Sequence, residues 1–599
     1  MCCEYHYFQC MWKTVQISSS SGAACVAKNI KYRTVDGLKE QLIDSFSLGT
    51  SSGVIELLDS SGSIVALADL EDDGVYYIPS YADICPDIAG SGCWSSNRLW
   101  QTKDPIHDMI ALPDFCQKII DTPEFQRLRD IKQLGACSLV YIGAQHSRFE
   151  HCIGTAQLAF KMTSNLKIKQ PELRITSTDV LCVAIAGLCH DLGHGPFSHV
   201  WDDLIFPLVG VPSHHKHENN SIALFRSIIE RIHRVDPRLS GLSSLDLVFI
   251  QAMIHPPKTS EWDPSIMGRE RDKRFLYEIV SNKRSGLDVD KFDYIQRDCH
   301  NTGVKGVFEI DRVILNASVR ECEGELQICW PEKELENLYE VFQTRESLHR
   351  RVYQHRVTKS TEGMIRDIFV LVAPHMRVQS DSGEWLTFQQ AQTDPSAYLH
   401  LSDWLMQLIL HGPHISIDFS HPEVVKAKHI IEDIRARKLW KFVGSTIFKG
   451  ENPVKMAEEL ADCSSGRLPP EAFEIRDSVF SWGMGHANPI ENVRFINKHT
   501  DHPMKLRPED ASKMLPGAFK EQKTLVFVKR TDAGSRRIAM EAFTLWCKGR
   551  GLKASTHDDS GAHLTRCHKR SKAASDGDES SEQATPQKRK LVKSFSARV

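Results

Sequence analysis

The stretch Gly187–His199, G-L-C-H-D-L-G-H-G-P-F-S-H, constrains this chain more than any other. It overlaps the end of the apolar run Val180–Leu188, which predicts a rigid buried helix. Imidazole and carboxylate side chains follow at once, and these are ligands of borderline to hard divalent metal ions. Two glycines and a proline then favour an end to the helix and a turn back over the metal: Gly193, Gly195 and Pro196. The stretch therefore predicts a metal site at one end of a buried helix.

Other segments complete the predicted ligand set, which comes from three separate helices or helix ends. It comprises His151, His190, Asp191 and Asp290. Two imidazoles and two carboxylates leave coordination positions for water and a phosphate oxygen, as a catalytic metal requires. The same residues admit zinc, iron, manganese or magnesium. We interpret His214 and His215 as ordinary polar residues, and Asp288 and Asp293 as helix caps or ion-pair partners.

The composition is that of a soluble globular protein with several domains. The 599 residues are 41% hydrophobic and 25% charged, and the formal net charge of −3 gives no global signature of nucleic-acid binding. The 17 cysteines are scattered without C-x-x-C pairs, which favours a reducing, intracellular setting. Apolar runs are too short for a transmembrane helix, and the N-terminus lacks the order of a signal peptide.

We expect a mainly α fold: an HD-type helical core, a smaller α+β C-terminal lobe and a small N-terminal β-grasp-like module. The predicted divisions are residues 1–27 (loose and disordered), 28–79 (the module), 80–99 (linker), 100–370 (helical core), 371–550 (lobe for regulation and oligomerisation) and 551–599 (disordered tail). The module rests on a strand, helix and hairpin order resembling ubiquitin-like folds. It indicates interaction with an unknown partner, although a simple extension of the next domain is the alternative.

Apolar periodicity places the main elements. Predicted helices of the core are Phe115–Ile120, Phe125–Leu134, Val180–Leu188, Ile222–Ile232 and Leu335–Phe342. The lobe is expected to contain helical segments at Ala391–Leu410, Val424–Phe442 and Arg536–Lys548, with strands at Phe473–Trp482, Val493–Asn497 and Thr524–Lys529.

The C-terminal tail carries a basic cluster at Lys588–Lys590 and Lys593. Such a cluster indicates a nuclear import signal or contact with nucleic acid, with a solvated charge run as the alternative. We expect a nuclear location, with the cytoplasm also open. Thr585 precedes Pro586 and is a candidate phosphorylation site.

The order H…HD…D is the signature of the HD-domain phosphohydrolases. Longer strings resemble the vertebrate sterile-alpha-motif and HD-domain deoxynucleoside triphosphate triphosphohydrolases: D-P-I-H, I-D-T-P-E-F-Q-R-L-R-D-I-K-Q-L-G, R-F-E-H, the opening stretch, F-L-Y-E-I-V-S-N-K-R-S-G-L-D-V-D-K-F-D-Y and R-E-S-L-H-R-R-V-Y-Q-H. The resemblance spans about Asp104–Lys548. It implies hydrolysis of a dNTP at the α-phosphorus to deoxynucleoside and inorganic triphosphate, which lowers dNTP pools and restricts viral DNA synthesis.

The resemblance also implies residue roles. The 5′-alkoxide is a poor leaving group, so a general acid is needed; His199, tuned by Asp202, is similar to the family's proton donor. His194 and His217 match its other active-site histidines. Arg148, Lys291 and Arg345 match triphosphate-binding positions. The remaining nucleoside-binding positions are Gln133, Leu134, Tyr294, Asp298, His349, Tyr353 and Gln354. Tyr353 under the ribose would exclude a 2′-OH, and loose contacts to the base make all common dNTPs expected substrates.

Activation in the family comes from GTP and dNTP bound between subunits, bridged by Mg²⁺, as dimers become a tetramer. Asp121, Gln126 and Arg129 match the guanine-reading part. The dNTP-binding part is matched by Val140, Arg312, Lys333, Asn337, His355 and Arg356. Departures at Trp100–Lys103, Pro331 and Ile447–Leu468 leave activator preference and tetramer stability open, although Lys103 is a candidate replacement. The different N-terminal module suggests a paralogue or a divergent vertebrate form.

Two other functions remain as alternatives. One is an HD-type phosphodiesterase acting on nucleic acid or a cyclic nucleotide. The other is a scaffold that binds single-stranded nucleic acid and has weak or no dNTPase activity.

Overall fold

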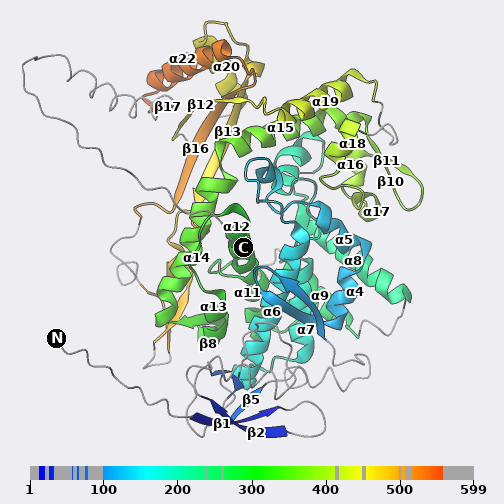
Figure 1. Cartoon of the computed structure of the whole chain (residues 1–599), viewed down its shortest axis with the longest axis vertical. Helices are drawn as coiled ribbons and strands as arrows, with labels where there is room; N and C mark the ends of the chain where they lie inside the picture. The colour runs from blue at the N-terminus through cyan, green and yellow to red at the C-terminus, as the bar shows by residue number, and fades with distance from the viewer. Residues whose placement is uncertain are drawn as a thin grey trace, which may run out of the picture.

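The fold is mainly helical with small sheets, as predicted, and Figure 1 shows this computed structural model. The structure describes five short N-terminal strands and residues 99–556, apart from 213, 236–240, 258–261, 412–416, 418, 448–452, 498–501 and 507–515. Three predicted segments lie outside the described residues: the linker except residue 99, nearly all of the C-terminal tail, and the helix of the N-terminal module, which the sequence places near residues 35–46.

The N-terminal strands form one mixed sheet in the order β2-β1-β5-β3-β4. The strands are β1 Lys13–Ser19, β2 Val26–Tyr32, β3 Leu57–Leu58, β4 Ile64–Val65 and β5 Val75–Ile78. Strand β1 pairs antiparallel with β2 and parallel with β5. Strand β1 and the first two residues of β2 lie within residues 1–27, the segment that was expected to be loose.

Two long helices form the centre of the molecule, α6 Arg148–Lys169 and α7 Ser177–Cys189. Every residue of α7 is buried except Thr178, which accounts for its continuous apolar run. Helix α12 Val289–Thr302 packs on α6, and α9 Ser244–Ile254 packs on α7.

The other helices of the core surround this centre. They are α4 Asp114–Ile120, α5 Pro123–Gln126, α8 His217–Val235, α10 Pro264–Met267, α11 Tyr277–Val280, α13 Ile310–Asn316, α14 Leu335–Leu348 and α15 Arg356–Val372. Short π-helical turns occur at Trp201–Ile205 and His349–Tyr353.

The C-terminal half contains α16 Phe388–Ala391, α17 Pro395–Tyr398, α18 Leu405–His411, α19 Pro422–Arg435, α20 Pro453–Cys463 and α22 Ala533–Gly549. A four-stranded sheet has the order β13-β16-β12-β17, with β12 Lys441–Thr446, β13 Phe473–Ser481, β16 Lys520–Val528 and β17 Ser555–Thr556. The three predicted strands and the last helix of this region are confirmed.

Several short strands were not predicted. Strands β6 Leu99–Asp104 and β7 Asp108–Pro113 form a hairpin at the start of the supposedly all-α core. In a second four-stranded sheet, β8 Ser318–Cys322 pairs with β9 Glu325–Pro331, and β15 Pro503–Met504 pairs with β14 Arg494–Ile496. Strand β14, which is the strand predicted at Val493–Asn497, joins the two pairs through β9. A small hairpin joins β10 Arg377–Gln379 to β11 Trp385–Thr387.

Three predicted helices are shorter or broken. The helix expected over Phe125–Leu134 consists of α5 and a 3-10 turn, Arg127–Asp130, and the chain then becomes extended. The helical segment expected over Ala391–Leu410 is divided among α16, α17 and α18. Helix α19 ends at Arg435, so the rest of Val424–Phe442 leads into β12.

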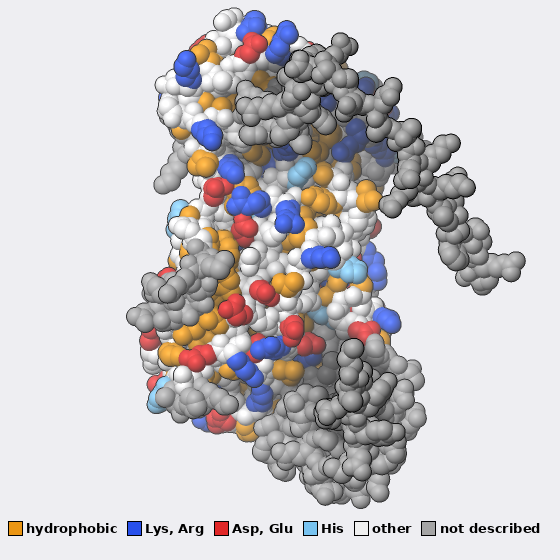
Figure 2. Space-filling model, turned by 60° about the vertical axis from the view of Figure 1, so that its left-hand side comes forward, with side chains coloured by type: hydrophobic (Ala, Val, Ile, Leu, Met, Phe, Trp, Pro, Cys, Tyr) orange, Lys and Arg blue, Asp and Glu red, His pale blue; other side chains and the backbone are white. Residues whose placement is uncertain are grey.

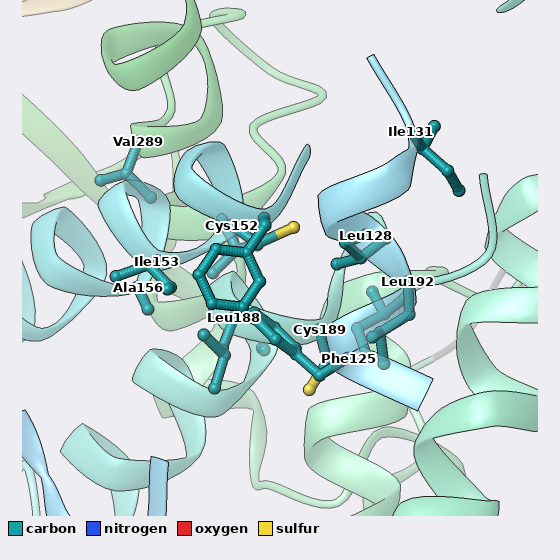
Figure 3. Close-up of a cluster of buried hydrophobic side chains, with 14 of the residues drawn as sticks. Phe125, Leu128, Ile131, Cys152, Ile153, Ala156, Leu188, Cys189, Leu192 and Val289 are labelled. Carbon is teal, nitrogen blue, oxygen red and sulfur yellow. The ribbon is translucent and has the colours of Figure 1, made fainter. Parts of the chain in front are cut away.

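The core behind the predicted metal site is a cluster of apolar side chains (Figure 3). Phe125 and Leu128 contribute from α5 and the turn after it, while Cys152, Ile153 and Leu188 come from α6 and α7. These side chains are almost fully buried. The helix ends that bear the ligands are therefore fixed by close packing.

Acidic and basic side chains are interspersed over the face shown in Figure 2, in keeping with the small net charge. Among the described helices, none is both long and apolar enough to cross a membrane.

Candidate active site

The four predicted metal ligands converge. His151 lies in the first turn of α6, His190 and Asp191 directly follow α7, and Asp290 lies in the first turn of α12. The Nε2 atom of His151 is 3.2 Å from Asp290 Oδ1 and 3.5 Å from Asp191 Oδ2. The Nε2 atom of His190 is 3.4 Å from the same Asp290 oxygen and 3.5 Å from Asp191 Oδ1.

The donor atoms fit a divalent metal ion. Both Nε2 atoms are buried and have no hydrogen-bond partner within the described structure. The opposite nitrogens are engaged: His151 Nδ1 lies 2.7 Å from Asp293 Oδ2, and His190 Nδ1 donates to the carbonyl of Gly187 at 2.8 Å. These bonds favour the tautomers that leave both Nε2 lone pairs available for a metal. Burial disfavours ionisation of Asp290, but the adjacent imidazoles of His151 and His190 outweigh it and lower the pKa of Asp290.

A buried polar network stands behind His151. Asp293 accepts from His107 Nε2 at 2.6 Å and from Arg297 Nε at 2.9 Å, and Arg297 in turn pairs with Asp104 at 2.8 Å. Asp293 is therefore an ion-pair partner, as predicted. Asp288 caps α12 and pairs with Lys291 at 2.9 Å, as predicted. This network helps to orient His151, and its other members, Asp104, His107 and Arg297, were not predicted to do so. The string D-P-I-H contains the first two of them.

A group of histidines adjoins the metal ligands. The rings of His194 and His217 stack with centroids 3.7 Å apart, and the ring of His199 is 5.1 Å from that of His194. Asp202 hydrogen-bonds to His217 Nδ1 at 2.5 Å, and it also lies close to His199. Burial disfavours the protonated form of His217, but the bond to Asp202 outweighs it and raises the pKa of His217.

Two of the three glycines in the stretch Gly187–His199, namely Gly193 and Gly195, are required by close packing. A Cβ on Gly193 would lie 2.0 Å from the carbonyl oxygen of His217, and one on Gly195 would lie 2.2 Å from the ring of Trp201. The turn continues through Phe197 and Ser198, which have positive φ angles of 58° and 55°. The prediction that the chain folds back over the site is confirmed, with left-handed residues at positions that are not glycine.

A cavity of about 420 Å³ opens beside the metal ligands. Its lining includes Asp191, Asp290, Arg148 and the three histidines His194, His199 and His217. It also includes the triphosphate-binding candidate Arg345 and all seven predicted nucleoside-binding residues, namely Gln133, Leu134, Tyr294, Asp298, His349, Tyr353 and Gln354. Lys291 and Asp202 do not line it. Lys359 and Glu362 do, and neither was predicted, since α15 carries no distinctive motif at these positions.

Polar contacts shape both ends of this cavity. At one end the Tyr353 hydroxyl donates to Asp298 Oδ2 at 2.5 Å, and His146 Nε2 is 2.7 Å from the other oxygen of Asp298. At the other, Arg148 contacts Asp191 and donates to Ser198 Oγ at 2.9 Å. Arg345 donates to the Tyr294 hydroxyl at 3.1 Å.

The predicted activator residues fall into separate groups. Asp121, Gln126 and Arg129 line one cavity of about 590 Å³, together with Lys103. Arg312 pairs with Glu334 at 2.8 Å and donates to the carbonyl of Lys333, and Asn337 bonds to the backbone of Glu309. The third group is elsewhere: His355 lies beside Tyr141, which follows Val140, and Arg356 lies over the ring of Phe442.

The fold and the histidine–aspartate centre define an HD-domain phosphohydrolase, a class that uses a divalent metal, and the HD-domain family model matches residues 148–248. The chain is 40% identical over 476 residues to the deoxynucleoside triphosphate triphosphohydrolase SAMHD1 of Danio rerio, covering 75% of this chain and 74% of the relative. The human protein of that name is 39% identical over 466 residues, covering 75% and 73%. A homolog from Dictyostelium discoideum is 35% identical over 434 residues, covering 72% and 77%. The chain therefore belongs to the SAMHD1 family of deoxynucleoside triphosphate triphosphohydrolases.

Proposed function

We propose that this enzyme cleaves dNTPs to deoxynucleoside and inorganic triphosphate. The observation that carries the proposal is the continuity of one cavity, from the His–Asp ligand set to the Tyr353–Asp298 pair. A phosphate chain and a deoxyribose would fit these two ends together, and the names of the relatives state the same activity.

His151, His190, Asp191 and Asp290 would bind the divalent metal, which when bound polarises a phosphate oxygen and lowers the pKa of a water molecule. Arg148 and Arg345 line the cavity and would pair with the triphosphate oxygens through charge-assisted hydrogen bonds. Lys291 does not line the cavity, and its ammonium group is paired with Asp288. It would bind the triphosphate only after leaving this pair.

His199 would donate a proton to the 5′-oxygen of the leaving deoxynucleoside. It lines the cavity and adjoins His194, which stacks on His217. Asp202 would act through His217, whose protonated form it favours, and so would keep positive charge beside the triphosphate. Asp298 would accept from the 3′-OH, and Tyr353, held by its bond to Asp298, would exclude a 2′-OH.

Asp290→Ala and His190→Ala should each abolish turnover of dNTP, because each removes one of four ligands. The assay separates nucleoside, inorganic triphosphate and pyrophosphate by anion exchange, with circular dichroism to verify folding. Full turnover by either folded variant would refute the metal assignment. Release of nucleoside monophosphate from nucleic acid or a cyclic nucleotide, without triphosphate, would instead favour the phosphodiesterase alternative.

We also propose activation by GTP and dNTP through Mg²⁺-bridged binding and tetramer formation, a nuclear location, and a role in restricting viral DNA synthesis. The cavity containing Asp121, Gln126 and Arg129 supports an activator site, and Lys103 lies beside them. The scaffold alternative predicts strongly salt-dependent binding of single-stranded nucleic acid and no dNTP turnover at saturating GTP.

The domain boundaries given from the sequence remain proposals. We extend the N-terminal module so that it begins with β1 at Lys13. Binding of a partner by this module and phosphorylation of Thr585 also remain proposals; Thr585 lies outside the described residues.

A further inference from the structure

A second group of metal-ligand side chains lies outside the active site, at the start of α19. His375 ends the short turn that follows α15, and His421 and Glu423 lie at the N-terminus of α19. One donor atom from each residue can be chosen so that all three lie within 4.8 Å of one another. No residue of this group belongs to the catalytic cavity.

The geometry of the three side chains is that of a partly formed site. His375 Nε2 is 2.7 Å from Glu423 Oε2, and the rings of His375 and His421 have centroids 3.6 Å apart at an interplanar angle of 31°. His421 Nδ1 carries a lone pair that accepts only a long 3.3 Å hydrogen bond from the backbone N–H of Glu423.

A metal site explains this arrangement of side chains better than a surface ion pair between His375 and Glu423 does. An exposed His–Glu pair contributes little to stability and does not require a second imidazole against the first. Two imidazoles and one carboxylate with open positions for water are a usual zinc ligand set. Half of the Glu423 side chain is exposed to solvent, which leaves room for those waters.

The site lies at the neck of a long excursion of the chain. His375 lies two residues before the start of β10, and His421 immediately precedes α19. Between them the chain forms β10, β11, α16, α17 and α18, which Figure 1 shows beside α19. An isolated β-bridge between Met376 and Ile417 already joins the two ends of the excursion. A metal held by His375 and His421 would join them a second time.

This excursion supports the catalytic stretch. Tyr398 donates to the carbonyl of Gly193 at 2.8 Å, Asp403 accepts from the N–H of Phe197 at 2.6 Å, and Gln392 accepts from Trp201 at 2.9 Å. Closing the neck reduces the conformational freedom of the segment that makes these contacts.

We propose that His375, His421 and Glu423 bind a divalent transition metal ion, chiefly Zn²⁺, and that this ion fastens the neck of the 376–417 excursion. The proposal does not depend on the proposed catalytic roles, because it concerns metal content and stability and not turnover.

The test compares the full-length enzyme with His421→Asn, its HD centre loaded in both. Asparagine is a good N-cap, so this variant keeps the start of α19 while removing one imidazole. After dialysis against buffered free Zn²⁺, the zinc content measured by mass spectrometry should be one ion per chain lower in His421→Asn. The zinc-dependent rise in Tm should also disappear. His375→Ala should behave in the same way.

His429→Ala is the matched control, because His429 is an exposed histidine on the same helix, 3.1 Å from Glu432. It should retain the additional zinc. Basal dNTP turnover in zinc-free buffer should be the same in all three variants and the parent enzyme. Equal zinc content of the parent enzyme and His421→Asn at every free zinc concentration would overturn the proposal, as would loss of the additional ion in His429→Ala.

Discussion

Asp293 lies behind His151 and is buried completely. It accepts hydrogen bonds from His107 and Arg297, and it lies 2.7 Å from His151 Nδ1. Burial alone would raise the pKa of Asp293, but the charge of Arg297 outweighs burial and lowers it well below its usual range. The carboxylate therefore stays ionised, fixes the tautomer of His151 and directs Nε2 to the metal position.

Asp293→Asn should weaken metal binding by about 10–100-fold, because outer partners of metal-binding histidines contribute on that order. Turnover measured against metal concentration should shift to higher metal and recover in part at saturation. Asp311→Asn is the control, since Asp311 forms only an exposed pair with Lys161 at 3.2 Å. An unchanged metal dependence in Asp293→Asn would contradict the positioning role.

The predicted metal ligands, which the fold brings together, are residues that distinctive sequence strings carry. His190 and Asp191 are adjacent in the chain, and the string around Asp290 is distinctive. The bond between His107 and Asp293 spans 186 positions, so no local pattern reveals it. The resemblance implied that Asp202 tunes His199, and the fold places the two residues close together; the hydrogen bond between Asp202 and His217 was not predicted.

At the scale of elements, α7 has two parts to play. It leads directly into two of the four proposed metal ligands, His190 and Asp191, and it forms the buried centre of the core. Its N-terminus is fixed by a capping box in which Thr176 accepts from the N–H of Asp179 and Asp179 accepts from the N–H of Thr176. Asp179 also pairs with Arg269 at 2.7 Å and with Lys273 at 3.3 Å. Burial opposes ionisation of Asp179, but these donors outweigh it and lower its pKa.

Asp179→Asn should lower the free energy of unfolding by about 3 kcal/mol at neutral pH, because it leaves Arg269 short of a buried partner. A lowered pKa in the folded state means that the ionised carboxylate stabilises the fold above the unfolded pKa of about 4, and that this contribution is lost as pH falls through the lower folded pKa. The difference between the two proteins should therefore shrink below about pH 4. Urea unfolding at neutral and acidic pH measures it.

Asp433→Asn provides the matched surface substitution, because Asp433 lies 3.6 Å from Lys438 and is 44% exposed in its side chain. It should change stability little at either pH. A pH-independent loss of stability in Asp179→Asn would show that shape and not charge is responsible.

The elements missed from sequence are those decided by tertiary pairing. The pattern of Phe125–Leu134 suits a helix, but the backbone of Lys132 pairs with Ser147 and that of Gln133 donates to His146, which makes this part extended. Helix α7 was predicted well, because a helix buried on all sides needs an uninterrupted apolar run.

At the scale of the whole molecule, the proposed activator residues are distributed over distant elements. Figure 1 places α13, which bears Arg312, in the lower half of the view and α15, which begins with Arg356, in the upper half. A nucleotide that contacts both the group around Arg312 and the group around Arg356 would have to lie between copies of the chain. Nucleotide binding and assembly would then favour each other by thermodynamic linkage.

Arg129→Ala should separate activation from catalysis. Arg129 lines the cavity of about 590 Å³, donates to Gln126 Oε1 at 2.8 Å and lies over the ring of Phe149, away from the metal ligands. Its loss should reduce the stimulation of turnover by GTP by roughly 5–150-fold, the usual range of coupling between sites. Light scattering should show weaker assembly in GTP.

Arg435→Ala, which removes an exposed arginine that pairs with Gln407 and His411 on α18, should retain both responses. Full stimulation of Arg129→Ala by GTP would exclude this cavity as the activator site, whereas loss of turnover without GTP would mean that Arg129 also supports the catalytic core.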